Sequence, residues 1–293
     1  RIQTHASRHC LSLGLMQESR ALWEQAIASL NHQCTLHPEN IEIADFLVQA
    51  QLLKVEWLCQ LGDLEEAYRI ALILITQIQV TQKNISDAET RQSLLCECLE
   101  HFSFCCHHLQ KTQQELSALN ELQRIRSGLL KADPDSVPLK TKYYELLVAM
   151  ARNALKTGSM HRCAELYQEA LKGFNDLHEQ HRSNMSYWLS IGDILVHLGQ
   201  TYQHLNNAAA TQLTLSKALQ VADWLAKEGS DSYVMQLAAT KIIFAVSQSS
   251  AYQSQKLDLL KMAENQAKSL HHHSQDPAVN SLIREISQQL TQT

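Results

Sequence analysis

A short pattern recurs along this chain with a step close to 48 residues. In each copy a small residue follows a polar residue and precedes Leu, Ile or Lys. These small residues are Ala26, Ala170, Ala218 and Ala267, with steps of 144, 48 and 49 residues. Candidate turn residues keep the same lattice, at Gly14, Gly62, Gly158 and Asn206. Prolines follow it too, at Pro38, Pro134 and Pro277. A fixed period of this length predicts a solenoid of stacked supersecondary units.

The composition indicates that these units are helical. The 293 residues include only 8 Gly and 4 Pro, so regular elements can run long before a breaker stops them. Hydrophobic residues make up 45% of the chain, which is a globular value. Aromatic residues make up only 6%, whereas strands favour aromatic and β-branched residues. We therefore expect an all-α protein with an ample core.

Residues 40–84 show the plan of one unit. Apolar residues recur at helical spacing up to Leu61 and again from Leu64 onwards, which predicts two amphipathic helices. Gly62 between them suits a left-handed C-cap. Asp63 can accept hydrogen bonds from the first free N–H groups of the second helix. The sequence therefore predicts an antiparallel helix hairpin with a tight turn.

The same plan repeats along the whole chain. The expected units are 1–36, 40–84, 88–133, 137–180, 184–228 and 232–275, with a closing helix at 278–291. First helices are expected near 40–61, 88–110, 137–156, 184–205 and 232–250, and second helices near 15–36, 63–83, 113–132, 159–180, 207–228 and 254–273. We expect 1–293 to form a single domain, a right-handed α-solenoid of about six hairpins. Because the chain begins with Arg1 inside an apolar helical pattern, we expect it to be part of a longer protein.

Several of these residues resemble tetratricopeptide-like repeats. Leu195, Leu198, Gly199 and Tyr202, followed by Ala218 and Leu219, are similar to the Leu-Gly-x-x-Tyr core and the small residue of that family. The segment from Leu61 to Ala67 looks like its turn, and Asp133-Pro134 resembles its closing proline. The period departs from the 34 residues of the family, so both helices are longer. The resemblance implies a repeat region of a bacterial multidomain regulatory or signalling protein.

Cysteine and histidine gather in one predicted helix. Cys98, His101, Cys105 and His108 lie along one side of it, and these side chains are plausible zinc ligands. One straight helix, however, spreads the four over about 15 Å, too far for one tetrahedral ion. Packing of the apolar stripe is the alternative interpretation, and we expect no metal and no cofactor. We expect all eight cysteines, listed as Cys10, Cys34, Cys59, Cys96, Cys98, Cys105, Cys106 and Cys163, to be reduced thiols in a cytoplasmic protein.

Motifs of catalysis and of other binding classes are absent from the sequence. It contains no phosphate-binding glycine loop, nucleophile elbow or His-Glu-x-x-His motif. The pair His161 and Cys163 lacks an evident orienting group, and the triplet 271–273 suits a solvated helix end. Net charge is −5 without a basic run, which argues against nucleic acid. No apolar run reaches the length of a membrane span. We expect no enzyme activity in this segment, although an attached catalytic domain such as a kinase stays open.

The sequence predicts a protein–protein interaction or scaffold module. Stacked hairpins form a groove lined by first helices, which can take a peptide or a partner helix. The candidate partner-binding residues on the first helices are Gln49, Glu56, Gln60, Glu97, His107, His108, Glu145, Arg152, Lys156, Asp193, Gln200, Gln203 and His204. Solvated helix faces are the alternative interpretation of many of them. A ligand-sensing module with a small molecule inside the superhelix is the alternative function.

Overall fold

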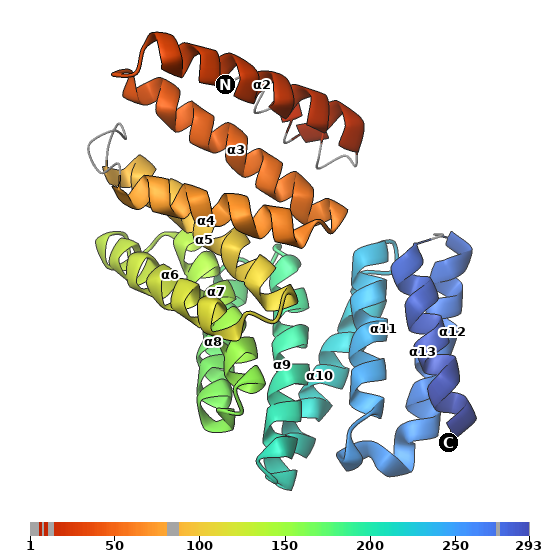
Figure 1. Cartoon of the computed structure of the whole chain (residues 1–293). Coiled ribbons are helices and arrows are strands. Elements are labelled where there is room, and N and C mark those ends of the chain that lie inside the picture. Colours follow the sequence, from red (N-terminus) through yellow and green to blue (C-terminus); the bar gives the residue numbers. More distant parts are fainter. Residues whose placement is uncertain (1–5, 8, 11–14, 81–87, 274–275, 293) are drawn as a thin grey trace. The chain divides into compact units, whose positions relative to one another are not determined.

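The described part of the chain is helical, with no strand in it. A computed structural model describes residues 6–7, 9–10, 15–80, 88–273 and 276–292 (Figure 1). Its long helices are α2 (Met16–Leu36), α3 (Ile41–Leu61), α4 (Leu64–Val80), α5 (Ala88–His108), α6 (Thr112–Ala132), α7 (Val137–Lys156), α8 (Met160–Gln180), α9 (Ser186–His204), α10 (Ala208–Glu228), α11 (Tyr233–Ser247), α12 (Lys256–His273) and α13 (Pro277–Gln292). The predicted all-α fold class is confirmed, and the expected Gly14 turn lies outside the described residues.

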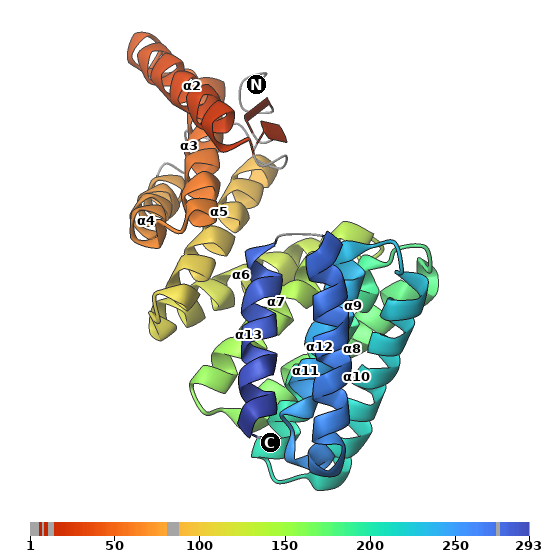
Figure 2. The same cartoon turned by 90° about the vertical axis from the view of Figure 1, so that its right-hand side faces the viewer.

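The chain divides into two compact units at Asp133-Pro134. Unit 1 comprises residues 1–133 and unit 2 comprises residues 134–293. Within each unit, each of the described helices from α2 to α13 packs against the next one along the chain. In addition, α3 contacts α5, α9 contacts α11, and α11 contacts α13 (Figure 2). Contact between alternate helices is the pattern of stacked hairpins. The division of the chain into the six expected repeat units stays a prediction.

The turns within the hairpins share one backbone conformation. Gly62, Gly158 and Asn206 all have positive φ, at 87°, 76° and 55°. Gln110 has it too, with a φ of 58°, in the hairpin that has no glycine at its turn. These four residues follow one another at steps of 48. In the first of these turns, Gly62 ends α3 and the Glu66 N–H donates to Asp63 Oδ1, as the sequence predicts.

The core of unit 1 begins with two tryptophans. The rings of Trp23 on α2 and Trp57 on α3 lie 6.0 Å apart. The Trp57 indole N–H also donates to the Met16 carbonyl oxygen at 3.0 Å, which ties the start of α2 to α3. Farther along, the rings of Tyr68 on α4 and Phe102 on α5 stack with centroids 5.0 Å apart. Aromatic contacts therefore link successive hairpins of this unit.

Unit 2 holds the other two tryptophans and a close contact between α7 and α8. The rings of Trp188 and Trp224 lie 4.8 Å apart, between α9 and α10. Gly173 on α8 lies directly against the Tyr144 ring of α7, because a Cβ built there would be 2.2 Å from Tyr144 Cζ. The repeating alanines are all buried: Ala26, Ala170, Ala218 and Ala267 are exposed by 3% or less.

One first helix is shorter than its sequence predicts. The expected helix near 232–250 ends at Ser247, and a 3₁₀ helix follows at Ser250–Gln255. Ser249 caps this short helix, since its hydroxyl accepts the Ala251 N–H at 3.3 Å. Tyr252 leaves helical geometry with φ −117° and buries its ring.

Candidate functional site

A recess of 200 Å³ opens among three helices of unit 2. Its floor is apolar and its rim is charged. The lining residues are Glu145, Val148 and Arg152 from α7, Phe174 from α8, and Ser190, Asp193 and Ile194 from α9. Phe174 and Ile194 are almost fully buried. We call this the α7–α9 recess, and it offers an apolar surface beneath ionic groups.

An ion pair spans the rim of the α7–α9 recess. Arg152 on α7 donates through Nη2 to Asp193 Oδ2 on α9 at 2.7 Å. Both side chains remain 43% exposed, so water screens the pair and its contribution to stability is small. His197 Nδ1 lies 2.8 Å from the Asp193 carbonyl oxygen, which can only accept, so the ring carries a proton at Nδ1. The ion pair is therefore positioned by α9 and still open to a partner.

A buried tyrosine lies beside this ion pair. Tyr167 on α8 is fully buried, and its ring stacks on His197 with centroids 5.9 Å apart. Burial raises the pKa of Tyr167 well above its ordinary value, and the nearby charge of Cys163 would add to that rise, while Arg152 opposes it. The phenol therefore stays neutral at physiological pH. Tyr167 therefore packs against the His197 ring and does not exchange protons with solvent.

Three of the seven predicted site residues in unit 2 meet at the recess. These are Glu145, Arg152 and Asp193. Glu145 is half exposed and forms an ion pair with Lys142, with 3.3 Å between Oε2 and Nζ. The remaining four lie nearer the C-terminal ends of their helices. Lys156 and His204 are exposed, Gln200 is half-buried, and Gln203 accepts a hydrogen bond from Ser249 at 2.6 Å.

The predicted site residues of unit 1 lie on α3 and α5. Gln49, Glu56 and Glu97 are half-buried, and Gln60 is exposed. His107 Nδ1 lies 2.9 Å from Glu115 Oε1 of α6, so this side chain joins the two helices of its own hairpin. His108 is exposed, with its ring 4.4 Å from that of Phe104. A role for these six residues in partner binding stays a prediction.

Sequence reasoning missed four of the residues that line the recess. Val148 and Ser190 lie three to four positions from predicted residues on the same helices, so the helical period could have found them. Phe174 belongs to a second helix, and the prediction placed the site on first helices alone. The apolar side chain of Ile194 predicts a core position, and the residue is both buried in the core and part of the floor of the recess.

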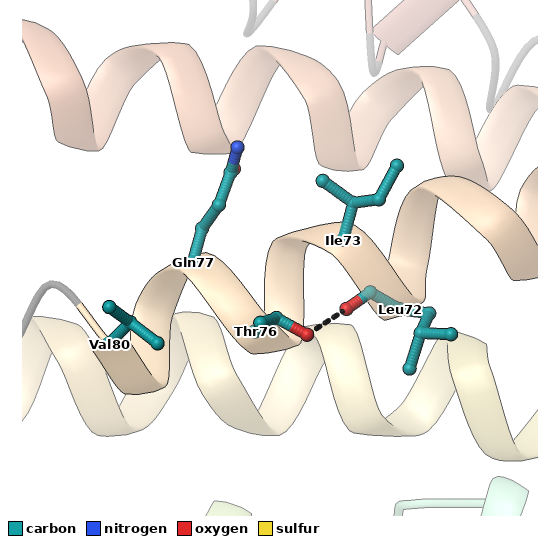
Figure 3. Close-up of a pocket in the computed structure, with 5 residues that line it drawn as sticks. All are labelled: Leu72, Ile73, Thr76, Gln77 and Val80. Atoms are coloured by element: carbon teal, nitrogen blue, oxygen red, sulfur yellow. Dashed lines mark hydrogen bonds between the residues drawn. The ribbon is translucent and has the colours of Figure 1, made fainter.

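A second recess, of 470 Å³, lies on one helix of unit 1. Figure 3 shows the residues that line it, all from α4: Leu72, Ile73, Thr76, Gln77 and Val80. The Thr76 hydroxyl donates to the Leu72 carbonyl oxygen at 2.9 Å, which leaves little free polar capacity there. The exposed fractions of Leu72, Ile73 and Val80 are 42%, 56% and 77%. This part of α4 is therefore an exposed apolar face.

The cysteines do not form a metal centre in the described part of the chain. All eight are free thiols, and the described residues contain no group of three His, Cys, Asp or Glu side chains that could hold a metal. Cys98 and Cys105 are fully buried, whereas His108 is exposed, so the four residues of the predicted helix stripe do not converge. Burial raises the pKa of Cys163, which disfavours a nucleophilic thiolate.

Comparisons with known proteins bear on the fold. No protein-family model matches the sequence, and no curated protein matches it. None of the described helices is long and apolar enough to cross a bilayer. The structure is similar to that of BtubC (BKLC) from P. vanneervenii, with a TM-score of 0.58, 12% identity, and coverage of 89% of this chain and 94% of that one.

A second solved structure is similar over nearly the whole chain. It is a Signal Transduction ATPase with Numerous Domains (STAND) protein with a tetratricopeptide repeat sensor, from Pyrococcus horikoshii. The TM-score is 0.60 and the identity 14%, and the likeness covers 97% of this chain. This chain spans only 38% of that protein. Together with the observed hairpins, these likenesses show that the chain has a tetratricopeptide-like helical-repeat fold.

Proposed function

We propose that this chain is a protein-interaction module that holds a segment of a partner polypeptide on the first helices of unit 2. The observation that carries the proposal is the α7–α9 recess, where the Arg152–Asp193 ion pair stands over the buried Phe174. A partner side chain can bury apolar atoms against this floor and place a polar end at the rim. Apolar anchors surrounded by polar contacts are typical of peptide recognition in grooves.

The size of the recess favours a side chain over a whole small molecule. Pockets that enclose small ligands usually measure about 300–1,000 Å³, and most of the ligand is buried in them. The α7–α9 recess measures 200 Å³ and lies at half-exposed residues. A ligand of ordinary size would remain largely in water there. A side chain of a bound polypeptide needs no such enclosure, because the rest of the segment is held along neighbouring helices.

The charges of the recess also indicate the kind of partner. Its rim carries two carboxylates, Glu145 and Asp193, and one guanidinium, Arg152, which is already paired. Glu145 is paired with Lys142 as well, so the rim has no excess of positive charge that would attract phosphate, and a polypeptide fits it better than a nucleic acid. We propose that the module works without enzyme activity of its own, in a regulatory or signalling protein of the bacterial cytoplasm. Its free thiols are in keeping with a reducing compartment.

The experiment begins with selection of binders from a random-peptide display library on the full chain. Recovered peptides are then measured by fluorescence anisotropy against charge-reversal variants. We expect Arg152→Glu to weaken binding about tenfold or more, since a rim charge that contacts the peptide changes sign. Lys217→Glu, an exposed change on the second helix α10, is the matched control and should leave the affinity unchanged.

A charge swap separates loss of contact from loss of fold. In the double variant Arg152→Asp with Asp193→Arg, the ion pair can form again with its ends exchanged. The melting temperature should stay close to that of the wild type, since the exposed pair contributes little to stability, while peptide affinity should stay low because the two charges have exchanged helices. Peptides that bind all variants equally, or that lose affinity only with Lys217→Glu, would overturn the assignment of the site.

A further inference from the structure

Two cysteines of unit 1 face each other across a helix contact. Cys59 lies near the end of α3 and Cys105 near the end of α5, and their Sγ atoms are 3.6 Å apart. The two helices contact each other, although the residues are 46 positions apart in the chain. A disulfide has an S–S length of about 2.05 Å, so the sulfur atoms need to approach by roughly 1.5 Å. Closing this gap requires rotation of the two side chains or a shift of the helix ends.

The surroundings of the pair distinguish the two thiols. Cys105 is fully buried, whereas Cys59 is partly exposed. The hydrogen bond from the Cys59 thiol lowers the pKa of Cys105, and the charge of Lys111 lowers it further, while burial opposes both. The pKa of Cys59 is raised by the same hydrogen bond. Cys105 is therefore the thiol that loses its proton first, and the Cys59 thiol donates a hydrogen bond to the resulting thiolate.

Lys111 is held in place close to this pair. Its ammonium lies 3.1 Å from Glu65 Oε2 and 3.6 Å from the centroid of the Tyr68 ring. Its backbone N–H donates to the carbonyl oxygen of Cys106, which fixes the turn after α5. A cation held near a thiol favours the thiolate, which is the nucleophilic form. The pair therefore combines a reactive sulfur with a second thiol within reach to resolve it.

We propose that Cys59 and Cys105 are a reversible redox modification site, at which hydrogen peroxide converts the two thiols into a disulfide that ties α3 to α5. The Cys105 thiolate attacks the peroxide oxygen, the O–O bond breaks, and the leaving hydroxide takes up a proton to become water. The sulfenic acid formed on Cys105 then reacts with the Cys59 thiol. The S–S bond forms, the S–O bond breaks, and a second water leaves. In sum, two thiols are oxidised by two electrons and one hydrogen peroxide is reduced.

The neighbouring cysteines differ from this pair and serve as controls. Cys96 and Cys106 are buried, and burial raises their pKa to about 11 and about 12. Burial also raises the pKa of Cys98. These three thiols are therefore protonated at physiological pH and react slowly with peroxides. Cys106 is the closest control, because it is the neighbour of Cys105 in the sequence and on the same helix.

The test treats the fully reduced chain with an equimolar amount of hydrogen peroxide. Peptide mapping by mass spectrometry without a reductant should recover the segments containing Cys59 and Cys105 joined together, with a mass 2 Da below their sum. Dithiothreitol should release them. The disulfide should also raise the melting temperature, by about 5 °C for a closed loop of this length.

Matched variants decide between this site and general oxidation of thiols. Cys59→Ser and Cys105→Ser should each abolish the joined peptide, and Cys106→Ser should retain it, with all three checked for native helicity by circular dichroism. The mapping of the wild-type chain alone decides the matter if a variant fails to fold. Joined peptides that contain other cysteines, or oxygen added to the thiols without any joined peptide, would overturn the proposal.

Discussion

The repeating alanines predict a large cost for one substitution on α10. Ala218 is fully buried on this helix, which packs against both α9 and α11. Replacing it by Trp inserts an indole ring where only a methyl group fits, so the helices must separate or neighbouring side chains must leave their rotamers. Ala209 on the same helix is exposed, so Ala209→Trp makes the same chemical change in water.

The magnitude follows from packing. Adding even a few methylene groups to a full core costs about 1–3 kcal/mol, and an indole adds far more volume. We therefore expect Ala218→Trp to lower the free energy of unfolding by about 3 kcal/mol or more. An exposed substitution usually stays within about 0.5 kcal/mol. With a urea m-value of about 3 kcal/mol per M, the urea midpoint falls by about 1 M or more for Ala218→Trp and changes by less than about 0.2 M for Ala209→Trp.

The assay is urea unfolding followed by far-ultraviolet circular dichroism, with both variants and the wild type measured together. Ala170→Trp on α8 should behave like Ala218→Trp, because Ala170 is also fully buried. If Ala218→Trp and Ala209→Trp shifted the midpoint equally, α10 would not pack through the buried alanine. A wild-type midpoint in Ala218→Trp would refute the argument from the repeat lattice as well.

Two further predictions concern single contacts. Gly173→Ala should lower the urea midpoint, because the new Cβ would overlap the Tyr144 ring. Gly128→Ala places its Cβ where no atom lies within 4 Å, so it should stabilise α6 by about 0.5–1 kcal/mol. Equal midpoints for the two variants would contradict this. The hydroxyl of Tyr233 and a backbone N–H at the start of α13 both lower the pKa of Asp276. The stability that these hydrogen bonds contribute is therefore fully present above the unfolded pKa of about 3.9, and it is lost as the pH falls through the lower pKa of the folded state. Melting temperatures of the wild type and Tyr233→Phe should therefore differ at neutral pH and converge in acid, and a constant difference would exclude the linkage.

The repeat period predicted the hairpins better than local turn chemistry did. Gly62 and Asn206 are recognisable turn residues, and both have positive φ. Gln110 is not a turn former, and its hairpin has no glycine at the turn. Yet it lies one step of 48 residues after Gly62 and adopts the same left-handed conformation. Stacking therefore imposes the turn geometry even where the residue does not favour it.

The period also predicted which positions are buried, but not how large their residues are. Leu74 and Leu122 lie on the same lattice as Ala26 and Ala218, and each is only 1% exposed. Residue size depends on the facing helix, which the period does not describe. In the α9–α10 hairpin, for example, Gly199 leaves room for a large residue, and a Cβ there would be 2.4 Å from Leu215 Cδ2.

The candidate site was less predictable because it depends on contacts between repeats. Helical spacing indicates the face of a helix, but not which residues of the next helix will meet it. Several contacts between successive repeats join residues 41 to 46 positions apart, such as Arg152 with Asp193 and Cys59 with Cys105. This separation lies just below the 48-residue period. A search for polar or reactive pairs at that distance could have found both contacts.

The distribution of tryptophan gives each compact unit its own optical reporter. The sequence has four tryptophans, with Trp23 and Trp57 paired in unit 1 and Trp188 and Trp224 paired in unit 2. A chain in which Trp188 and Trp224 are replaced by Phe emits from unit 1 alone, and the complementary double variant emits from unit 2 alone. Coincident fluorescence transitions in the two chains would mean that the units melt as one cooperative body. Separate transitions would mean that one half of the array can open while the other stays folded.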